Sequence, residues 1–177
     1  MTEAIRKKDN VHPITVGYNT PYVFLPCNQS LDFISNHVYE NLNTVTNYDT
    51  ILSNITAMDR LRSVYNKPIM IGEFNVSNGE KSGEAYYDVD NSSVAEMIHY
   101  LYAYAQGYSG VMKWALTDWP LFNIEQEATW WSGDEKYISE GRMGVYFYDG
   151  TLEGSPKPIA YALKFFSDYI MENGQRD

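Results

Sequence analysis

The sequence predicts an α/β protein with a parallel β-sheet, organised as a single domain over residues 1–177. Short apolar runs alternate with segments of helical periodicity, which is the pattern of βα units. One of these runs, Ile69–Ile71, follows Pro68, a residue that fits the first position of a strand because it needs no donor there. With 177 residues, 44% of them apolar, the chain can bury one substantial core.

The first half of the chain contains three predicted strands and two helices. A basic-ended helix is expected at about 2–9, then strands at 13–17 and 32–39, separated by a loop over 20–31. Apolar residues recur at helical spacing from Tyr48 to about Tyr65, and Asp49 or Thr50 can cap that helix. The third strand covers 68–73. A polar loop over 75–91 follows it.

The second half repeats the alternation once more. A helix is expected to begin at Ser92 or Ser93 and to end near Gly107, before a fourth strand at 110–114. A long loop, rich in aromatic and acidic residues, covers 117–142, and 145–148 is expected to form a small extra strand. Pro158 opens the last helix, since proline is favoured at the first helical position.

Composition excludes several function classes. The net charge is -10, with a pI near 4.7, which argues against a nucleic-acid partner because phosphate binding needs a basic face. No apolar run approaches the ~20 residues of a membrane span, and the N-terminus lacks the apolar stretch of a secretory signal. The single cysteine, Cys27, allows no intrachain disulfide, so a cytoplasmic location and a secreted bacterial enzyme both stay open.

Polar and aromatic side chains follow all four predicted strands. They are Asn19 after the first, His37 and Tyr39 in the second, Glu73 and Asn75 at the third, and Trp114 at the fourth. Because parallel strands direct their carboxyl ends to the same edge of a sheet, we expect these side chains to converge on one rim. Parallel α/β folds place their chemistry at that rim.

These strand ends resemble a known family. His37-Val38-Tyr39, Ile71-Gly72-Glu73-Phe74 and Trp114 look like strands six, seven and eight of the cellulase-type, retaining, clan A glycoside hydrolases. The resemblance covers nearly the whole chain and implies half of a TIM (β/α)8 barrel, namely strands five to eight with their helices. The fold would then be the C-terminal half-barrel of a catalytic domain that acts on β-glycosidic bonds of a polysaccharide or glycoside.

The resemblance also implies roles for individual residues. Glu73 would be the nucleophile that forms a glycosyl-enzyme intermediate, with Tyr39 donating a hydrogen bond that keeps the carboxylate ionised and aimed. His37 would line the subsite beside the scissile bond, and Trp114 would stack on the sugar bound there. Further substrate-binding candidates are Asn19, Asn75, Asp118 and Trp119. No cofactor and no metal are implied.

The second carboxyl group of a retaining glycosidase does not follow the family motif in this sequence. The family's acid/base is a Glu that follows an Asn at the end of strand four, and the chain begins after that point. Glu40, Asp118 and Glu125 are the nearest acids, but none fits the motif. We therefore expect the isolated chain to be inactive or very weak, and to pair as a homodimer or with an N-terminal half-barrel through its open strand edges.

Two other interpretations stay open at this stage. A non-catalytic carbohydrate-binding module could use Trp114, Trp119, Trp130, Trp131 and the many tyrosines as stacking platforms, although such modules are usually all-β. A doubly wound α/β protein of another function is the third, but no glycine-rich phosphate loop follows any strand and no metal-ligand spacing occurs. His12 and His99 are interpreted as structural, and His37 and Trp114 could also serve packing alone.

Overall fold

The computed structural model describes residues 1–20, 25–39, 48–76, 80–81, 84–85, 89–118, 143–148 and 154–174. The chain divides into two compact units, which are described separately. The first unit comprises Met1–Tyr39, Thr46–Phe74 and His99–Lys113, and the second comprises Glu40–Val45, Asn75–Ile98 and Trp114–Asp177. The expectation of a single domain stays a prediction.

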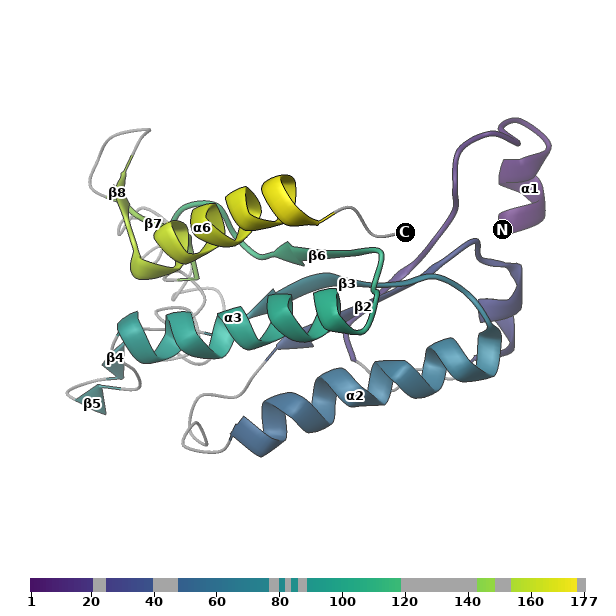
Figure 1. Ribbon diagram of the computed structural model, residues 1–177. Helices are drawn as coiled ribbons and strands as arrows, with labels where there is room; N and C mark the ends of the chain where they lie inside the picture. The colour runs from purple at the N-terminus through teal and green to yellow at the C-terminus, as the bar shows by residue number, and fades with distance from the viewer. Residues whose placement is uncertain are drawn as a thin grey trace. The chain divides into compact units, whose positions relative to one another are not determined.

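The first unit is built on a four-stranded parallel sheet with the strand order β1-β2-β3-β6 (Figure 1). Its strands are β1 (Gly17–Tyr18), β2 (Ile34–Tyr39), β3 (Ile69–Asn75) and β6 (Gly110–Lys113), and β3 reaches the second unit with its last residue. Gly17 pairs with Ser35, and Met70 pairs with Gly110. The predicted α/β class and parallel sheet are therefore confirmed, and the half-barrel stays a prediction.

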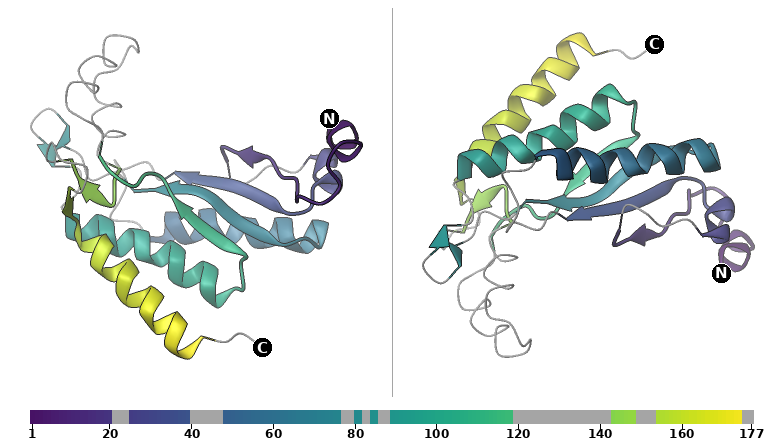
Figure 2. Two further views of the ribbon diagram at one scale, coloured as in Figure 1. Left: turned by 90° about the horizontal axis from the view of Figure 1, so that it is seen from above. Right: turned by 90° about the horizontal axis from the view of Figure 1, so that it is seen from below.

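Helices cover one face of this sheet. Figure 2 shows α2 (Tyr48–Tyr65) and the later half of α3 (Val89–Ala105) on the same side of the strands. Nine side chains that are at most 1% exposed form the core between them: Ile34, Val38, Ile55, Met58, Leu61, Ile69, Ile71, Phe74 and Ala103. Burying each of the larger ones stabilises the fold by ~1.5–3 kcal/mol.

A carboxylate on α2 ties this helix to α3. Asp59 accepts hydrogen bonds from the Tyr102 hydroxyl at 2.5 Å and from the Tyr108 hydroxyl at 2.9 Å. Burial, with the Asp59 carboxylate beside it, raises the pKa of Tyr102 to about 12, and it raises the pKa of Tyr108 further. Both tyrosines are therefore held in their neutral, donating form across the whole neutral range.

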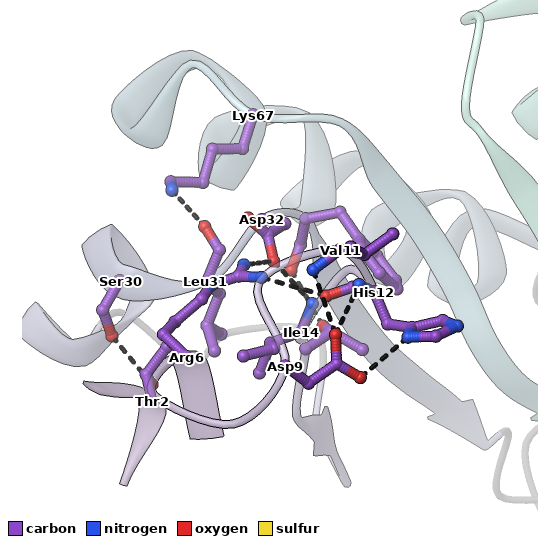
Figure 3. A network of polar contacts seen from close by, with 12 residues as sticks. Thr2, Arg6, Asp9, Val11, His12, Ile14, Ser30, Leu31, Asp32 and Lys67 are labelled. Atoms are coloured by element: carbon purple, nitrogen blue, oxygen red, sulfur yellow. Dashed lines mark hydrogen bonds and ion pairs between the residues drawn. The ribbon is translucent and has the colours of Figure 1, made fainter. Parts of the chain in front are cut away.

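The N-terminal segment is held by side-chain carboxylates, which corrects the first predicted strand (Figure 3). Asp32 forms an ion pair with Arg6 of α1 (Thr2–Arg6) and accepts the backbone N–H of Ile14 at 2.5 Å. That bond to Ile14 is the main reason why the pKa of Asp32 is lowered. The Asp32 side chain thus takes the Ile14 N–H that a longer strand would offer to the ladder, and β1 contains only Gly17 and Tyr18.

The other predicted elements differ from the structure mainly at their ends. The helix at Tyr48–Tyr65 is confirmed, as is the last helix, α6 (Pro158–Asn173), with proline in its first turn. The loop predicted after β3 contains β4 (Glu80–Lys81) and β5 (Glu84–Ala85), and α3 begins at Val89 instead of Ser92 or Ser93. The loop predicted before β2 contains a short 3₁₀ helix, η1 (Pro26–Ser30).

The second unit contains the described part of the chain after β6. The small strand predicted near Tyr146 is confirmed as β7 (Tyr146–Phe147), which pairs antiparallel with β8 (Ser155–Pro156). Isolated parallel pairing joins Thr117 to Tyr146. None of the described helices is both long and apolar enough to cross a membrane, and the described residues contain no cluster of three or more side chains suited to a metal ion.

Candidate active site

A β-bulge in β3 decides where Glu73 points. Ile71 pairs with Val111 of β6, but the next register pair is Phe74 with Lys113, so β3 contains one residue more than its partner. Ile71 and Phe74 are both fully buried, and Phe74 stacks on His99 of α3 with ring centroids 4.6 Å apart. The side chains at both ends of the bulge thus face the helices. Strict alternation from Ile71 would have placed Glu73 there as well, and the extra residue instead leaves it free to meet β2.

Glu73 meets two side chains from the neighbouring strand. The Tyr39 hydroxyl donates to Glu73 Oε2 at 2.5 Å, and His37 Nδ1 lies 3.1 Å from the same oxygen. Both come from alternate positions of β2, whose intervening residue Val38 is buried at 1% exposure. The structure thus brings together three of the residues that the sequence singled out, and all three belong to the first unit.

This geometry leaves one carboxylate oxygen available for chemistry. The side chains of His37 and Glu73 are 19% and 30% exposed, so the group is reachable from solvent without being fully hydrated. Oε2 is restrained by two neighbours, while Oε1 makes no hydrogen bond within the described ranges. A carboxylate fixed through one oxygen and open at the other is suited to nucleophilic attack.

Two glycines make room for side chains of β2, Gly17 for His37 and Gly72 for Ser35, and sequence reasoning missed them. A Cβ atom on Gly17 of β1 would lie 2.6 Å from His37 Nε2, and one on Gly72 of β3 would overlap the Ser35 hydroxyl. Strand glycines of this kind mark the close approach of a neighbouring group. Both glycines lie inside predicted strands, so they were the sequence signal for these close approaches.

Within the described residues, the remaining candidates form no hydrogen bond or ion pair with Glu73. Asn19 follows β1 and is exposed. Asn75, Trp114 and Asp118 belong to the second unit: Trp114 is 44% exposed, Asn75 is fully buried, and Asp118 is 8% exposed. Trp119 lies outside the described residues, as do Glu40 and Glu125.

The sequence matches no protein-family model. A search of curated proteins gives no match either. Solved structures do match. A β-D-glucuronidase from Dictyoglomus thermophilum aligns with 94% of this chain at a TM-score of 0.69 and 17% identity, and this chain covers 28% of it.

Two further structures show the same relation. A family 17 β-1,3-glucanosyltransferase from Rhizomucor miehei aligns with 89% of the chain (TM-score 0.62, 15% identity), and 53% of that protein is covered. A GH2 β-galacturonidase from Eisenbergiella tayi aligns with 93% (TM-score 0.62, 15% identity), with 28% of it covered. The chain therefore shares the fold of part of these glycoside hydrolases, and it spans about a quarter to a half of their length.

Proposed function

We propose that this chain is the nucleophile-bearing part of a retaining β-glycoside hydrolase. The observation that carries the proposal is the pair of contacts from Tyr39 and His37 to one oxygen of Glu73, which restrains the carboxylate and leaves Oε1 open. Supporting it, the solved structures that share this fold include β-glucuronidases, a β-galacturonidase and a β-1,3-glucanosyltransferase. The substrate class is a β-linked glycoside or polysaccharide.

The proposed first step is a displacement at the anomeric carbon. Glu73 Oε1 attacks that carbon, a carboxylate ester bond forms, and the glycosidic C–O bond breaks with its electron pair passing to the leaving oxygen. Water then hydrolyses the ester and restores the carboxylate. Tyr39 and His37 hold the carboxylate orientation through both steps. Separately, Trp114 of the second unit is 44% exposed, and we propose that it stacks on a sugar.

The leaving oxygen needs a proton in this step, and the proposal assigns no residue of this chain to donate it. Retaining enzymes place the donor carboxyl ~5–5.5 Å from the nucleophile. Its absence lowers the rate by ~10²–10⁴ for ordinary leaving groups. We accordingly propose that the chain alone turns over natural glycosides slowly or not at all.

A partner chain is part of the same proposal. Within the described residues, β1 and β6 are the edges of the parallel sheet, and each has one side without a strand partner. Met112 of β6 is 58% exposed. Unpaired edges of this kind favour strand addition, and we propose that an N-terminal half-barrel adds to them. A homodimer would be the alternative outcome of a test of oligomeric state.

Leaving groups that need no proton offer a direct test. Dinitrophenyl β-glycosides release a stable phenolate, so their cleavage needs no proton donor. The chain is expected to release dinitrophenolate in a single turnover, and Glu73→Gln should abolish the release. Glu172→Gln, on the exposed end of α6, is the matched control and should retain it. Release that survives Glu73→Gln would remove Glu73 as the nucleophile.

Binding without turnover is the second candidate function, because Trp114 and Tyr39 are 44% and 39% exposed and can stack on sugars without any reaction. Calorimetry with β-linked oligosaccharides separates the two candidates. Heat of binding together with no phenolate release from a dinitrophenyl β-glycoside would favour the binding module.

A further inference from the structure

Asn75 follows Glu73 by two residues, and its side chain is not exposed to solvent. It is fully buried, and its side-chain amide donates to two main-chain carbonyls, that of Trp114 and that of Met143, the latter at 2.8 Å. A side-chain amide has two N–H donors, so both are used on the backbone. The sequence predicted direct substrate binding for Asn75, and the structure shows its amide fixing the main chain at Trp114.

We infer that Asn75 is a positioning residue that holds Trp114 as a preset aromatic platform for a β-linked sugar. The inference rests on the proposed function for the identity of the ligand, but not for the positioning itself. The two carbonyls come from segments that lie 39 and 68 residues further along the chain. One amide therefore joins the end of β3 to the residue that follows β6 and to the segment before β7.

Backbone hydrogen bonds hold the main chain after Trp114 against residues 143–146. Ala115 N–H donates to Met143 O at 3.2 Å, Val145 N–H donates to Leu116 O at 2.9 Å, and Asp118 N–H donates to Tyr146 O at 3.0 Å. Residues 114–118 thus lie alongside residues 143–146 as a short two-stranded segment, which we call the Trp114 platform.

A buried ion pair closes the far end of the Trp114 platform. Asp118 Oδ1 accepts from Lys157 Nζ at 2.6 Å and from the Gly144 N–H at 2.8 Å, while the Lys157 N–H donates to Val145 O. The Lys157 side chain is 1% exposed and that of Asp118 is 10% exposed. Gly144 is required here because a Cβ would collide with the backbone of Thr117 and Asp118.

The main chain of Trp114 is fixed, whereas the residue is exposed. The Trp114 backbone is tied by Asn75, and the next residue is tied to Met143, yet Trp114 itself is 44% exposed. The main chain of Trp114 is thus fixed by hydrogen bonds, while a large part of the residue stays accessible to a ligand. Presetting a binding group in this way removes ordering entropy that a ligand would otherwise have to overcome.

Fluorine NMR of the whole chain labelled with 5-fluorotryptophan tests the inference without ligand. Trp114→Phe identifies the resonance, and Asn75→Ala and Asn75→Ser remove two donors and one donor, respectively. We expect the Trp114 line to shift and broaden in both, more in Asn75→Ala, while the other tryptophan lines stay in place. Asn173→Ala, which removes an exposed amide bonded to Tyr169 O, is the control and should change nothing at Trp114.

Titration with laminaritriose and cellotriose then measures the consequence. The affinity of Asn75→Ser for the oligosaccharide that binds the wild-type chain should fall about 10-fold. Losing one ordered hydrogen bond, or displacing Trp114 slightly, has an effect of this size. An unchanged Trp114 line in folded Asn75→Ser or Asn75→Ala would overturn the inference, as would unchanged affinity. If neither sugar shifts the Trp114 resonance of the wild-type chain, the proposed function is contradicted. The ligand-free spectra of the Asn75 variants then still test whether Asn75 positions Trp114.

Discussion

The buried ion pair between Lys157 and Asp118 makes a sharp prediction, because the same chain contains a matched exposed pair. Lys157 Nζ and Asp118 Oδ1 are 2.6 Å apart, with side chains 1% and 10% exposed. Lys164 Nζ and Asp168 Oδ2 are 2.7 Å apart on the surface of α6, with side chains 74% and 56% exposed. The two pairs share chemistry and distance, so burial is the variable that separates them.

Replacing Lys157 by Met leaves the Asp118 charge buried beside Gly144 without its partner. Breaking such a pair destabilises a protein by ~3–5 kcal/mol, and for this chain length each kcal/mol lowers the melting temperature by ~2–4 °C. We therefore expect Lys157→Met to melt roughly 6–20 °C lower. Lys164→Met should lose at most ~0.5 kcal/mol, since exposed i,i+4 pairs contribute little.

Calorimetric melting of the two single variants and of one double variant checks this reasoning. Lys157→Met combined with Asp118→Asn removes the unpaired charge and keeps an acceptor for the Gly144 N–H. We expect the double variant to recover at least half of the lost melting temperature. Equal melting of Lys157→Met and Lys164→Met would refute the account, as would a double variant less stable than Lys157→Met alone.

Three further predictions concern the sheet unit. Gly72→Ala should destabilise this unit by ~1–3 kcal/mol in urea unfolding, because the added methyl overlaps Ser35. Gly110→Ala is the control and should be nearly neutral, because its methyl meets only Met70 at 3.8 Å. Equal effects of the two substitutions would contradict the close approach of Gly72 to Ser35. The pKa of Tyr102 is raised to about 12, so the stability that it contributes is complete below pH ~10 and is lost as the pH rises through about 12. The pKa of Tyr108 is raised further, so its contribution begins to fall above pH ~10 and is only partly lost at pH 12. Urea unfolding from pH 8 to 12 should show this loss, and a flat profile would exclude it. For the chain without the proposed N-terminal half-barrel, light scattering after size exclusion should show self-association that rises with protein concentration. A monomer at all concentrations would argue against open edges at β1 and β6.

The sequence was sufficient for elements whose signal is local. Helical spacing of apolar residues from Tyr48 to Tyr65 predicted α2 with its observed bounds, and Pro158 marked the start of α6. The polar residues at the strand ends also led to the contact among His37, Tyr39 and Glu73, because side chains two apart in one strand share a face.

Features that depend on a distant partner could not be predicted in the same way. The bulge in β3 exists only relative to the register of β6. Gly72 lies inside it, but a strand glycine marks a close backbone approach as well as a bulge, so Gly72 alone does not identify the bulge. Ile14 lies in a run that reads as a strand, but the Asp32 side chain takes its N–H. Asn75 and Asp118 were predicted to bind substrate, but they are buried, and both form hydrogen bonds with the distant segment at Met143–Gly144.

The central claim is that Glu73 forms the covalent bond to the sugar, and covalent trapping tests it most directly. Dinitrophenyl 2-deoxy-2-fluoro-β-glycosides combine a leaving group that needs no acid with a fluorine that slows hydrolysis of the intermediate. After incubation and proteolysis, mass spectrometry should find the fluoroglycosyl group on the peptide that contains Glu73, and it should be absent from Glu73→Gln. A label on any other carboxylate, or an undiminished label in Glu73→Gln, would contradict the account.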